Sequence, residues 1–281
     1  MQDKHPGVFG EFVWTGFDYI GEPTPYGGDL TGLRPGTRAY DRAKELLDRQ
    51  NVTEVPSRSS YFWILDLAGF KKDRFWLYQS KWKPDLPMAH ILPHWNWPER
   101  KGLVTPVHVY TSGDEAELFL NGRSLGKKKK GQFEYRLRWD DVVYQSGELK
   151  VVAYKNGEKW AEEKVLTTGK ASRLSASADR PAITADGTDL VFITVRIEDK
   201  NGALVPRSSN LVNFSIQGPG KIVAVDNGDA TSHDPFQASQ RKAYNGLCLV
   251  IVKAEKGATG SFTVKADSKG LKGAAATVGL K

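Results

Sequence analysis

Short runs of alternating apolar and polar residues occupy the chain from about residue 86 to its end. A period of two places one face of a strand on a core, and Asn-Gly pairs between the runs favour tight hairpin turns. The runs fall into two groups, separated by the small polar linker TTGKAS at residues 167–172. We therefore expect two antiparallel β-sandwiches, over residues 86–168 and 169–281, the second with immunoglobulin-like strand spacing. The runs that carry this prediction are VTPVHVYT, EAELFLNG, QFEYRLRW, GELKVVAYKNG and EKWAEEKVL in the first group, and LVFITVRIED, NLVNFSI, GKIVAVDNG, LCLVIVKAE, GSFTVKAD and AAATVGL in the second.

Residues 1–85 mix strand and helix patterns. VFGEFVW, residues 8–14, predicts a short strand, whereas residues 37–51 and 70–82 have the apolar spacing of helices. The run SSYFWILDLAGF between the helices predicts a strand or a buried loop. A strand followed by helices is one unit of an eight-stranded α/β barrel, which needs about 250 residues in all. The expected fold is thus mainly β: two sandwiches preceded by the last strand-helix unit of a TIM barrel.

Composition excludes several classes of protein. With 40% hydrophobic and 26% charged residues the chain is typical of soluble globular proteins, and it shows neither a membrane span nor a signal peptide. The net charge of +7 accumulates towards residues 169–281, away from the aromatic residues, so nucleic acid is not an expected partner. The run Lys127 to Lys130 predicts an exposed hairpin turn. Cys248, the single cysteine, lies in the apolar run LCLVIV and is expected to be a core residue.

Aromatic residues and carboxylates share one turn-rich stretch near the start, GEFVWTGFDYIGEPTPYGG at residues 10–28. Aromatic faces cover the apolar face of a sugar, and carboxylates accept hydrogen bonds from its hydroxyls. Glu11, Asp18 and Glu22 are the acidic residues here. They come from a single strand and its loop, so a hydrolytic pair among them is not favoured, and the stretch is interpreted as the edge of a site.

Three motifs carry a resemblance to a known family: WTGFDYIGEPTPY, PSRSSYFWILDLAGFKKDRFWLYQSKW and HILPHWNWP. Together they resemble the C-terminal third of glycoside hydrolase family 2 enzymes, in particular the β-galactosidase-like proteins of Bacteroidetes. The resemblance implies a catalytic TIM barrel followed by β-sandwich modules, and a retaining mechanism with two glutamates. VFGEFVW matches the eighth barrel strand, so both glutamates are expected before Met1, and no catalytic residue is assigned to this chain.

The resemblance also implies the sugar-binding residues. Trp14 matches the tryptophan that closes the family's sugar pocket, and its alternative role is that of a buried aromatic at the barrel rim. Asp18 and Glu22 follow in the next loop, where they contact sugar hydroxyls or else brace the loop. Ser60-Tyr61-Phe62 stands where the family's glucuronidases carry Asn-x-Lys, which favours a neutral sugar such as galactose.

Other polar clusters favour structural roles. Pro93 separates His90 from His94 and argues against a zinc-binding helix. Trp95 and Trp97 form either a sugar platform or, as we prefer, packing between the barrel remnant and the first sandwich. The oxygen-rich loop VDNGDATSHD has calcium-type ligands but the sequence of an ordinary turn; its polar residues are Asp226, Asn227, Asp229 and Asp234. Neither a metal nor a cofactor is expected.

Two functions are compatible with the sequence. The favoured one is the C-terminal fragment of a retaining β-glycosidase acting on β-galactosides or related neutral β-glycosides, inactive by itself. Its partners would be the upstream catalytic barrel and, through the complete enzyme, a β-linked oligosaccharide in the periplasm or outside the cell. The alternative is a non-catalytic carbohydrate-binding or adhesion protein built of immunoglobulin-like modules. The sequence leaves the oligomeric state open.

Overall fold

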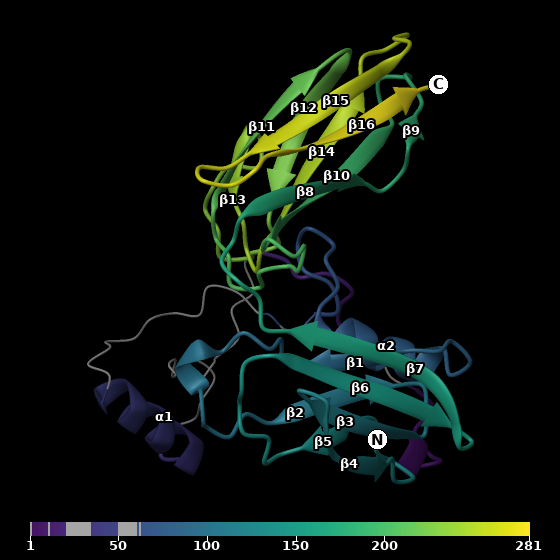
Figure 1. The fold of residues 1–281 in the computed structure, drawn as a ribbon, viewed down its shortest axis with the longest axis vertical. Coiled ribbons are helices and arrows are strands. Elements are labelled where there is room, and N and C mark those ends of the chain that lie inside the picture. Colours follow the sequence, from purple (N-terminus) through teal and green to yellow (C-terminus); the bar gives the residue numbers. More distant parts are fainter. Residues whose placement is uncertain (1, 11, 21–34, 50–60, 62) are drawn as a thin grey trace.

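The computed structural model describes residues 2–10, 12–20, 35–49, 61 and 63–281. The fold is mainly β, as the alternating pattern predicts, and its strands form four sheets grouped in two sandwiches (Figure 1). The described helices are two short 3₁₀ segments, η1 (Gln2–Lys4) and η2 (Pro98–Arg100), and two α-helices, α1 (Arg38–Arg49) and α2 (Asp73–Trp82).

The first sandwich holds a three-stranded and a four-stranded sheet, and every strand pair in it is antiparallel. The three-stranded sheet has the order β1-β2-β5, from β1 (Ala89–Leu92), β2 (Val107–Thr111) and β5 (Leu137–Trp139). The other sheet has the order β4-β3-β6-β7, from β3 (Glu115–Leu120), β4 (Arg123–Lys129), β6 (Glu148–Lys155) and β7 (Glu158–Leu166). Alternate residues of β3 are buried, and they join one core with Trp95 and Tyr144 between the sheets.

The second sandwich packs a four-stranded sheet on a five-stranded sheet. The first has the order β12-β14-β10-β8, from β8 (Arg173–Ala178), β10 (Leu190–Glu198), β12 (Gly220–Asp226) and β14 (Leu247–Ala254). The second has the order β13-β11-β15-β16-β9, from β9 (Ala182–Ile183), β11 (Leu211–Gln217), β13 (Gln240–Lys242), β15 (Ser261–Asp267) and β16 (Ala274–Leu280). Its pairs are antiparallel except β9 with β16, which is parallel.

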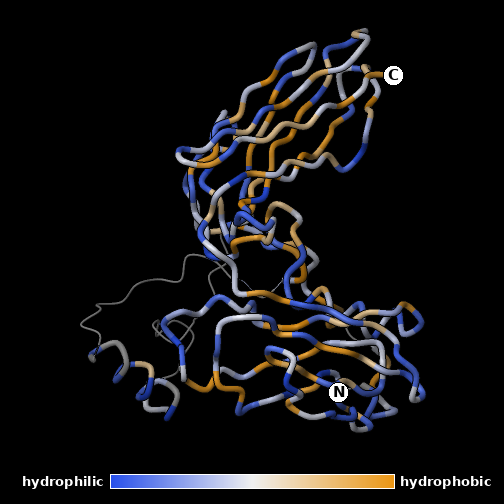
Figure 2. Tube along the Cα trace, in the orientation of Figure 1, coloured by the Kyte–Doolittle hydropathy of each residue, from blue (hydrophilic) through white to orange (hydrophobic). Residues whose placement is uncertain are grey.

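Each sandwich has its own hydrophobic core. Figure 2 shows apolar positions along the strands of both, alternating with polar ones. The buried residues of one cluster lie between Ile91 and Ala153, and those of the other between Leu174 and Val278. Cys248 is buried in the second cluster, as predicted, and burial raises the pKa of its thiol to about 12. The boundaries at residues 85 and 168 stay predictions.

Both predicted α-helices are confirmed. The side chain of Thr37 caps α1 by accepting a hydrogen bond from the backbone N–H of Tyr40 at 3.3 Å. Helix α2 packs on β1 and β2, where Trp76 stacks on His90 with 5.1 Å between ring centroids. His90 Nε2 also lies 2.9 Å from Asp73 Oδ1, so one side chain ties the start of α2 to the first sandwich.

Two local predictions were wrong. The described part of VFGEFVW, residues 8–10 and 12–14, forms no strand, because a strand needs a partner and none of the described strands lies beside it. The run at Lys127 is also not a turn: its first three lysines belong to β4, paired with β3. Glu115 explains why, since Lys127 Nζ lies 3.2 Å and Lys129 Nζ 3.7 Å from its carboxylate across the ladder.

Candidate functional site

The indole of Trp14 lies at the surface, on a loop that is held by contacts with Tyr19 and, through it, with the buried Trp63. The side chain is 68% exposed, and its Nε1–H donates to the Tyr19 hydroxyl at 3.3 Å. Tyr19 in turn stacks on the buried Trp63, with 5.1 Å between centroids and 25° between planes. An exposed aromatic ring is able to cover the apolar face of a sugar, and the sugar contact of Trp14 stays a prediction.

Further apolar side chains lie exposed around Trp14. Exposed apolar side chains gathered in one short stretch of chain favour an interaction with another surface. In the family resemblance, the missing barrel strands would lie against this stretch. The exposed side chains are Phe9, Phe12, Phe17 and Ile20.

Asp18 is buried, unlike Trp14. Its side chain is 1% exposed, and its two carboxylate oxygens accept hydrogen bonds from Lys72 Nζ at 2.8 and 2.9 Å. The backbone of the same loop forms a parallel bridge with the segment before α2: Asp18 N–H donates to Leu65 O at 2.9 Å, and Leu65 N–H to Gly16 O at 2.8 Å. Because the carboxylate is buried and paired with Lys72, we favour for Asp18 the bracing role that the sequence left open.

Residues 61–72 connect this loop to the second sandwich. Lys72 Nζ also donates to the carbonyl oxygen of Tyr61 at 2.7 Å, and the Tyr61 hydroxyl donates to Asp229 Oδ1 at 3.4 Å. The carboxylate of Asp66 lies directly against the Cα of Gly228, where an added Cβ would overlap it. The described part of the front segment therefore contacts both sandwiches, and not the first alone (Figure 1).

Asp66 is the carboxyl group with the largest perturbation in this contact. Burial raises its pKa to about 7, against the hydrogen bond that its Oδ1 accepts from Phe70 N–H at 2.8 Å; the charges of Asp226 and Asp18 raise it further. The carboxyl group is therefore protonated below neutral pH when the segment is docked, and ionised with an ordinary pKa of about 3.8 when it is free.

We predict that docking of residues 61–72 weakens as the pH rises. Between pH 4 and 7 the docked state holds a proton that the undocked state has lost, so its stability falls by up to about 1.4 kcal/mol per pH unit and levels off above about pH 7. Hydrogen-exchange protection factors of the Leu65 and Phe70 amides, measured across this range, test the slope. Asp66→Asn should make the profile flat; an unchanged slope in that variant would assign the titration to another group.

The other predicted site residues have structural roles or lie outside the described residues. Glu11, Glu22, Ser60 and Phe62 are in the second group. Trp95 is fully buried in the first core, where its Nε1–H donates to Gln145 O at 2.8 Å, so it cannot form a sugar platform. Trp97 stacks on His94 with 4.4 Å between centroids, and the exposed Trp82 packs against Tyr78.

The oxygen-rich loop of residues 226–234 satisfies its own backbone. Asp226 Oδ1 accepts from the N–H groups of Asn227 and Gly228, and Asp229 Oδ1 accepts from Thr231. The buried Arg241 donates to Asp234 O at 2.7 Å and to Asn227 Oδ1 at 3.3 Å, which pins the loop to β13. Within the described part of the chain, no three His, Cys, Asp or Glu side chains gather as metal ligands would.

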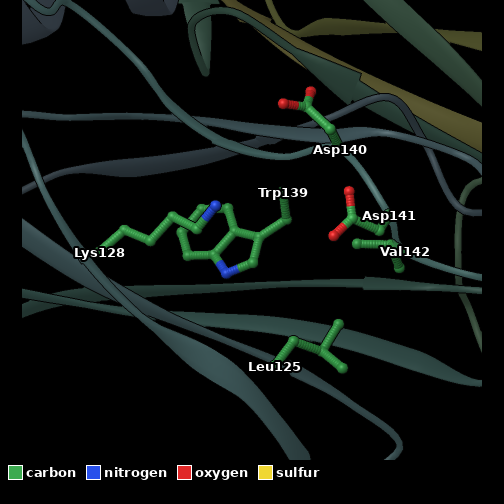
Figure 3. A pocket seen from close by; sticks show the side chains of 6 residues that line it. All are labelled: Leu125, Lys128, Trp139, Asp140, Asp141 and Val142. Carbon is green, nitrogen blue, oxygen red and sulfur yellow. The ribbon is translucent and has the colours of Figure 1, made fainter.

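A pocket of about 310 Å³ opens beside β4 and β5 (Figure 3). Two of its polar side chains are already paired: Lys128 Nζ donates to Arg138 O at 2.6 Å, and Asp140 accepts from the Arg138 guanidinium at 2.8 Å. Lys128 also extends across the ring of Trp139, which is buried. Since few groups are left to fix the orientation of a ligand, we do not assign this pocket a function. The residues that line it are Leu125, Lys128, Trp139, Asp140, Asp141 and Val142.

Sequence reasoning missed the residues that hold the Trp14 loop. Lys72 lies 54 positions from Asp18, and Asp229 lies 168 positions from Tyr61. No periodicity links positions so far apart, because the contacts depend on how the segments pack. In the sequence, the one sign of such a contact was Gly228, in the turn Asn227-Gly228-Asp229. Its φ is +80° in the structure, and a glycine there allows another group to approach closely.

Together these contacts describe a β-rich region of two sandwiches whose front segment carries an exposed tryptophan, Trp14. Residues 174–277 match the model for glycoside hydrolase family 2 C-terminal domain 5, and residues 102–161 match a domain of unknown function, DUF4982. The chain belongs to glycoside hydrolase family 2 and corresponds to the C-terminal region of its members.

Relatives and solved structures agree with this assignment. The chain is 41% identical to the β-galactosidase BoGH2A of Bacteroides ovatus over 94% of its own length, and 38% identical to a putative β-glucuronidase of Formosa agariphila over 82%. It spans only 28% and 20% of those proteins. A β-glycosidase structure from Bacteroides vulgatus superposes with a TM-score of 0.82 at 29% identity, covering 99% of this chain and 32% of that one. A family 2 structure from Bacteroides cellulosilyticus gives a TM-score of 0.80 at 30% identity, covering 100% and 37%.

Proposed function

We propose that this chain supplies one wall of the sugar pocket and the accessory sandwiches of a retaining β-glycosidase acting on β-galactosides or related neutral β-glycosides. The observation that carries the proposal is the exposed indole of Trp14 on a loop held by buried Asp18. The 41% identity to a β-galactosidase supports the substrate class. The same proposal places the complete protein in the periplasm or outside the cell. No helix of the described residues has the length and apolar character needed to cross a bilayer.

Retaining hydrolysis requires an acid/base and a nucleophilic carboxylate about 5 Å apart, both within reach of the anomeric carbon. Of the described residues 12–20, Asp18 is the only carboxylate, and its ion pair with Lys72 keeps it from either role. The chemistry is therefore assigned to the barrel that precedes this region in the family. Trp14 would cover the apolar C–H face of the pyranose and limit how the ring can lie.

The two substrate classes of the relatives differ in charge. A glucuronide carries a carboxylate that needs a cation in the pocket, whereas a galactoside carries only hydroxyls. The supporting segment has two lysines. Asp18 and Tyr61 already occupy the ammonium group of Lys72, and Lys71 Nζ lies over the rings of Phe75 and Trp76. This pairing, together with Ser60-Tyr61-Phe62 in place of Asn-x-Lys, supports the neutral sugar.

We predict that methyl β-D-galactopyranoside binds the chain weakly, in the millimolar range expected for one stacked sugar without its full pocket, and shifts the Trp14 indole N–H signal in NMR titrations. Trp14→Ala should abolish the binding. Trp82→Ala is the matched control, because this tryptophan is 63% exposed but lies on α2. Methyl β-D-glucuronide should bind no better than the galactoside. Equal binding by Trp14→Ala and the unaltered chain would contradict the proposal.

A further inference from the structure

The second sandwich reaches the loop of Trp14 through a continuous series of contacts. It begins at Arg241 on β13, which is buried and donates to both ends of the 226–234 loop. A side chain held in a core is a rigid support, because its rotamer is fixed by close packing. The 226–234 loop thus presents Gly228 and Asp229 in a fixed position towards residues 61–72.

Two contacts join the loop to that segment. Asp66 lies on the bare Cα of Gly228, and the Tyr61 hydroxyl donates to Asp229 Oδ1 at 3.4 Å. Glycine serves two purposes at position 228: its φ of +80° favours a residue without Cβ, and the missing Cβ leaves the space that the Asp66 carboxylate occupies. The fit therefore depends on one position of the second sandwich.

From residues 61–72 the contacts continue to Trp14. Lys72 joins the Tyr61 carbonyl to buried Asp18, and Leu65 pairs with the backbone on both sides of Phe17. Asp18 lies four residues after Trp14, whose indole N–H is bonded to Tyr19 in the same loop. A displacement at Gly228 would therefore be passed to the loop of Trp14 through Asp66, Lys72 and the buried Asp18.

We infer that the 226–234 loop of the second sandwich is a brace that positions the Trp14 loop, with Gly228 as the positioning residue and Asp66 as its contact on the front segment. The inference that the 226–234 loop positions the Trp14 loop depends only on these contacts. Its consequence for sugar binding rests on the proposed function. The second sandwich would accordingly influence which ligands the pocket holds, although none of its residues touches a ligand.

The test compares two glycines with the same backbone conformation. Gly228→Ala and Gly257→Ala both place a Cβ at a positive φ, +80° and +75°, so they share the backbone strain. Only the first meets a neighbour, since nothing lies within 4 Å of a Cβ at Gly257. We expect the amides of Asp18 and Leu65 to exchange at least about tenfold faster in Gly228→Ala than in Gly257→Ala.

A second substitution that restores protection would distinguish loss of the brace from destabilisation of the whole chain. Gly228→Ala combined with Asp66→Ala removes the overlapping carboxylate and should return a large part of the lost protection at Asp18 and Leu65. If Gly228→Ala does not fold, Tyr61→Phe, which removes only a hydroxyl, should still raise exchange at these amides. Equal exchange in the two glycine variants, or in Tyr61→Phe and the unaltered chain, would overturn the brace.

A titration with methyl β-D-galactopyranoside distinguishes the brace from the proposed function. If both hold, Gly228→Ala weakens the sugar-induced shift of the Trp14 indole and Gly257→Ala does not. If the exchange result holds but the unaltered chain shows no shift at all, the brace stands and the sugar-binding proposal fails. If sugar binds equally to both variants despite faster exchange, the inferred influence on the pocket is wrong.

Discussion

The purified chain is expected to release no nitrophenol from nitrophenyl β-D-galactopyranoside above the rate in buffer. A retaining glycosidase needs two carboxylates on opposite sides of the anomeric carbon, and together they supply nearly all of a rate enhancement that for enzymes spans roughly 10⁶ to 10¹⁷-fold. The one carboxylate of the described Trp14 loop, Asp18, is buried against Lys72. Glu11 and Glu22 lie outside the described residues and belong to the same short stretch of sequence as Asp18.

The assay needs a control for contaminating glycosidases, whose traces would exceed any weak activity of the chain. Activity that follows the protein through two chromatographic steps and disappears in Glu22→Gln or Asp18→Asn would refute the assignment of the chemistry to another region. Activity that survives both changes would come from a contaminant. The complete protein, assayed beside the chain, should release nitrophenol under the same conditions.

Lys72→Met is expected to reduce the local stability of the Trp14 loop more than Gly228→Ala or Tyr61→Phe does. It leaves the Asp18 carboxylate buried without its cation, and breaking a buried pair in this way costs about 3–5 kcal/mol. Hydrogen exchange at the Asp18 and Leu65 amides should rise more than about hundredfold, or reach full exposure if the local stability is smaller. Methionine keeps the length of the stem, so lost packing contributes little.

Two further variants serve as controls for the effect of Lys72→Met. Lys159→Met removes the cation of an exposed pair with Glu162, and such pairs contribute at most about 1 kcal/mol. The double variant Lys72→Met and Asp18→Asn should be less damaged than Lys72→Met alone, because it buries no charge. If Lys72→Met changes exchange no more than Lys159→Met does, the ion pair does not hold the Trp14 loop.

The sequence predicts most of the fold wherever a local pattern is long enough to interpret. The nine residues of β10 and the eight of β14 form long, largely apolar runs, and both strands were expected. β9, with two residues, and β13, with three, are too short to show a period of two. β4 was missed for another reason: its lysines look like a solvated turn until Glu115 on the adjacent strand is known. Charge pairing across a ladder is a property of two strands, not of one.

The candidate site, too, was predicted only where its residues belong to one local motif. Trp14 follows from a local motif, and the structure leaves its ring exposed. Asp18 belongs to the same motif, but its burial could not be foreseen because the partner lies in another segment. Residues 59–70 were expected to form a strand or a buried loop and residues 70–82 a helix, which describes where this segment lies but not its contacts. The burial and the contacts of these residues depend on packing between distant segments, which the sequence patterns do not show.

The contact between Tyr61 and Asp229 has a consequence for how such proteins exchange modules. A recombination event near residue 168 that brings in a terminal sandwich without a glycine opposite Asp66 would remove this fit. The hybrid would keep every residue of the sugar wall and still present it loosely. Lineages that swap the terminal module should therefore change positions 61 and 66 together with it, and grafted hybrids should recover their ligand affinity through compensating changes at those two positions.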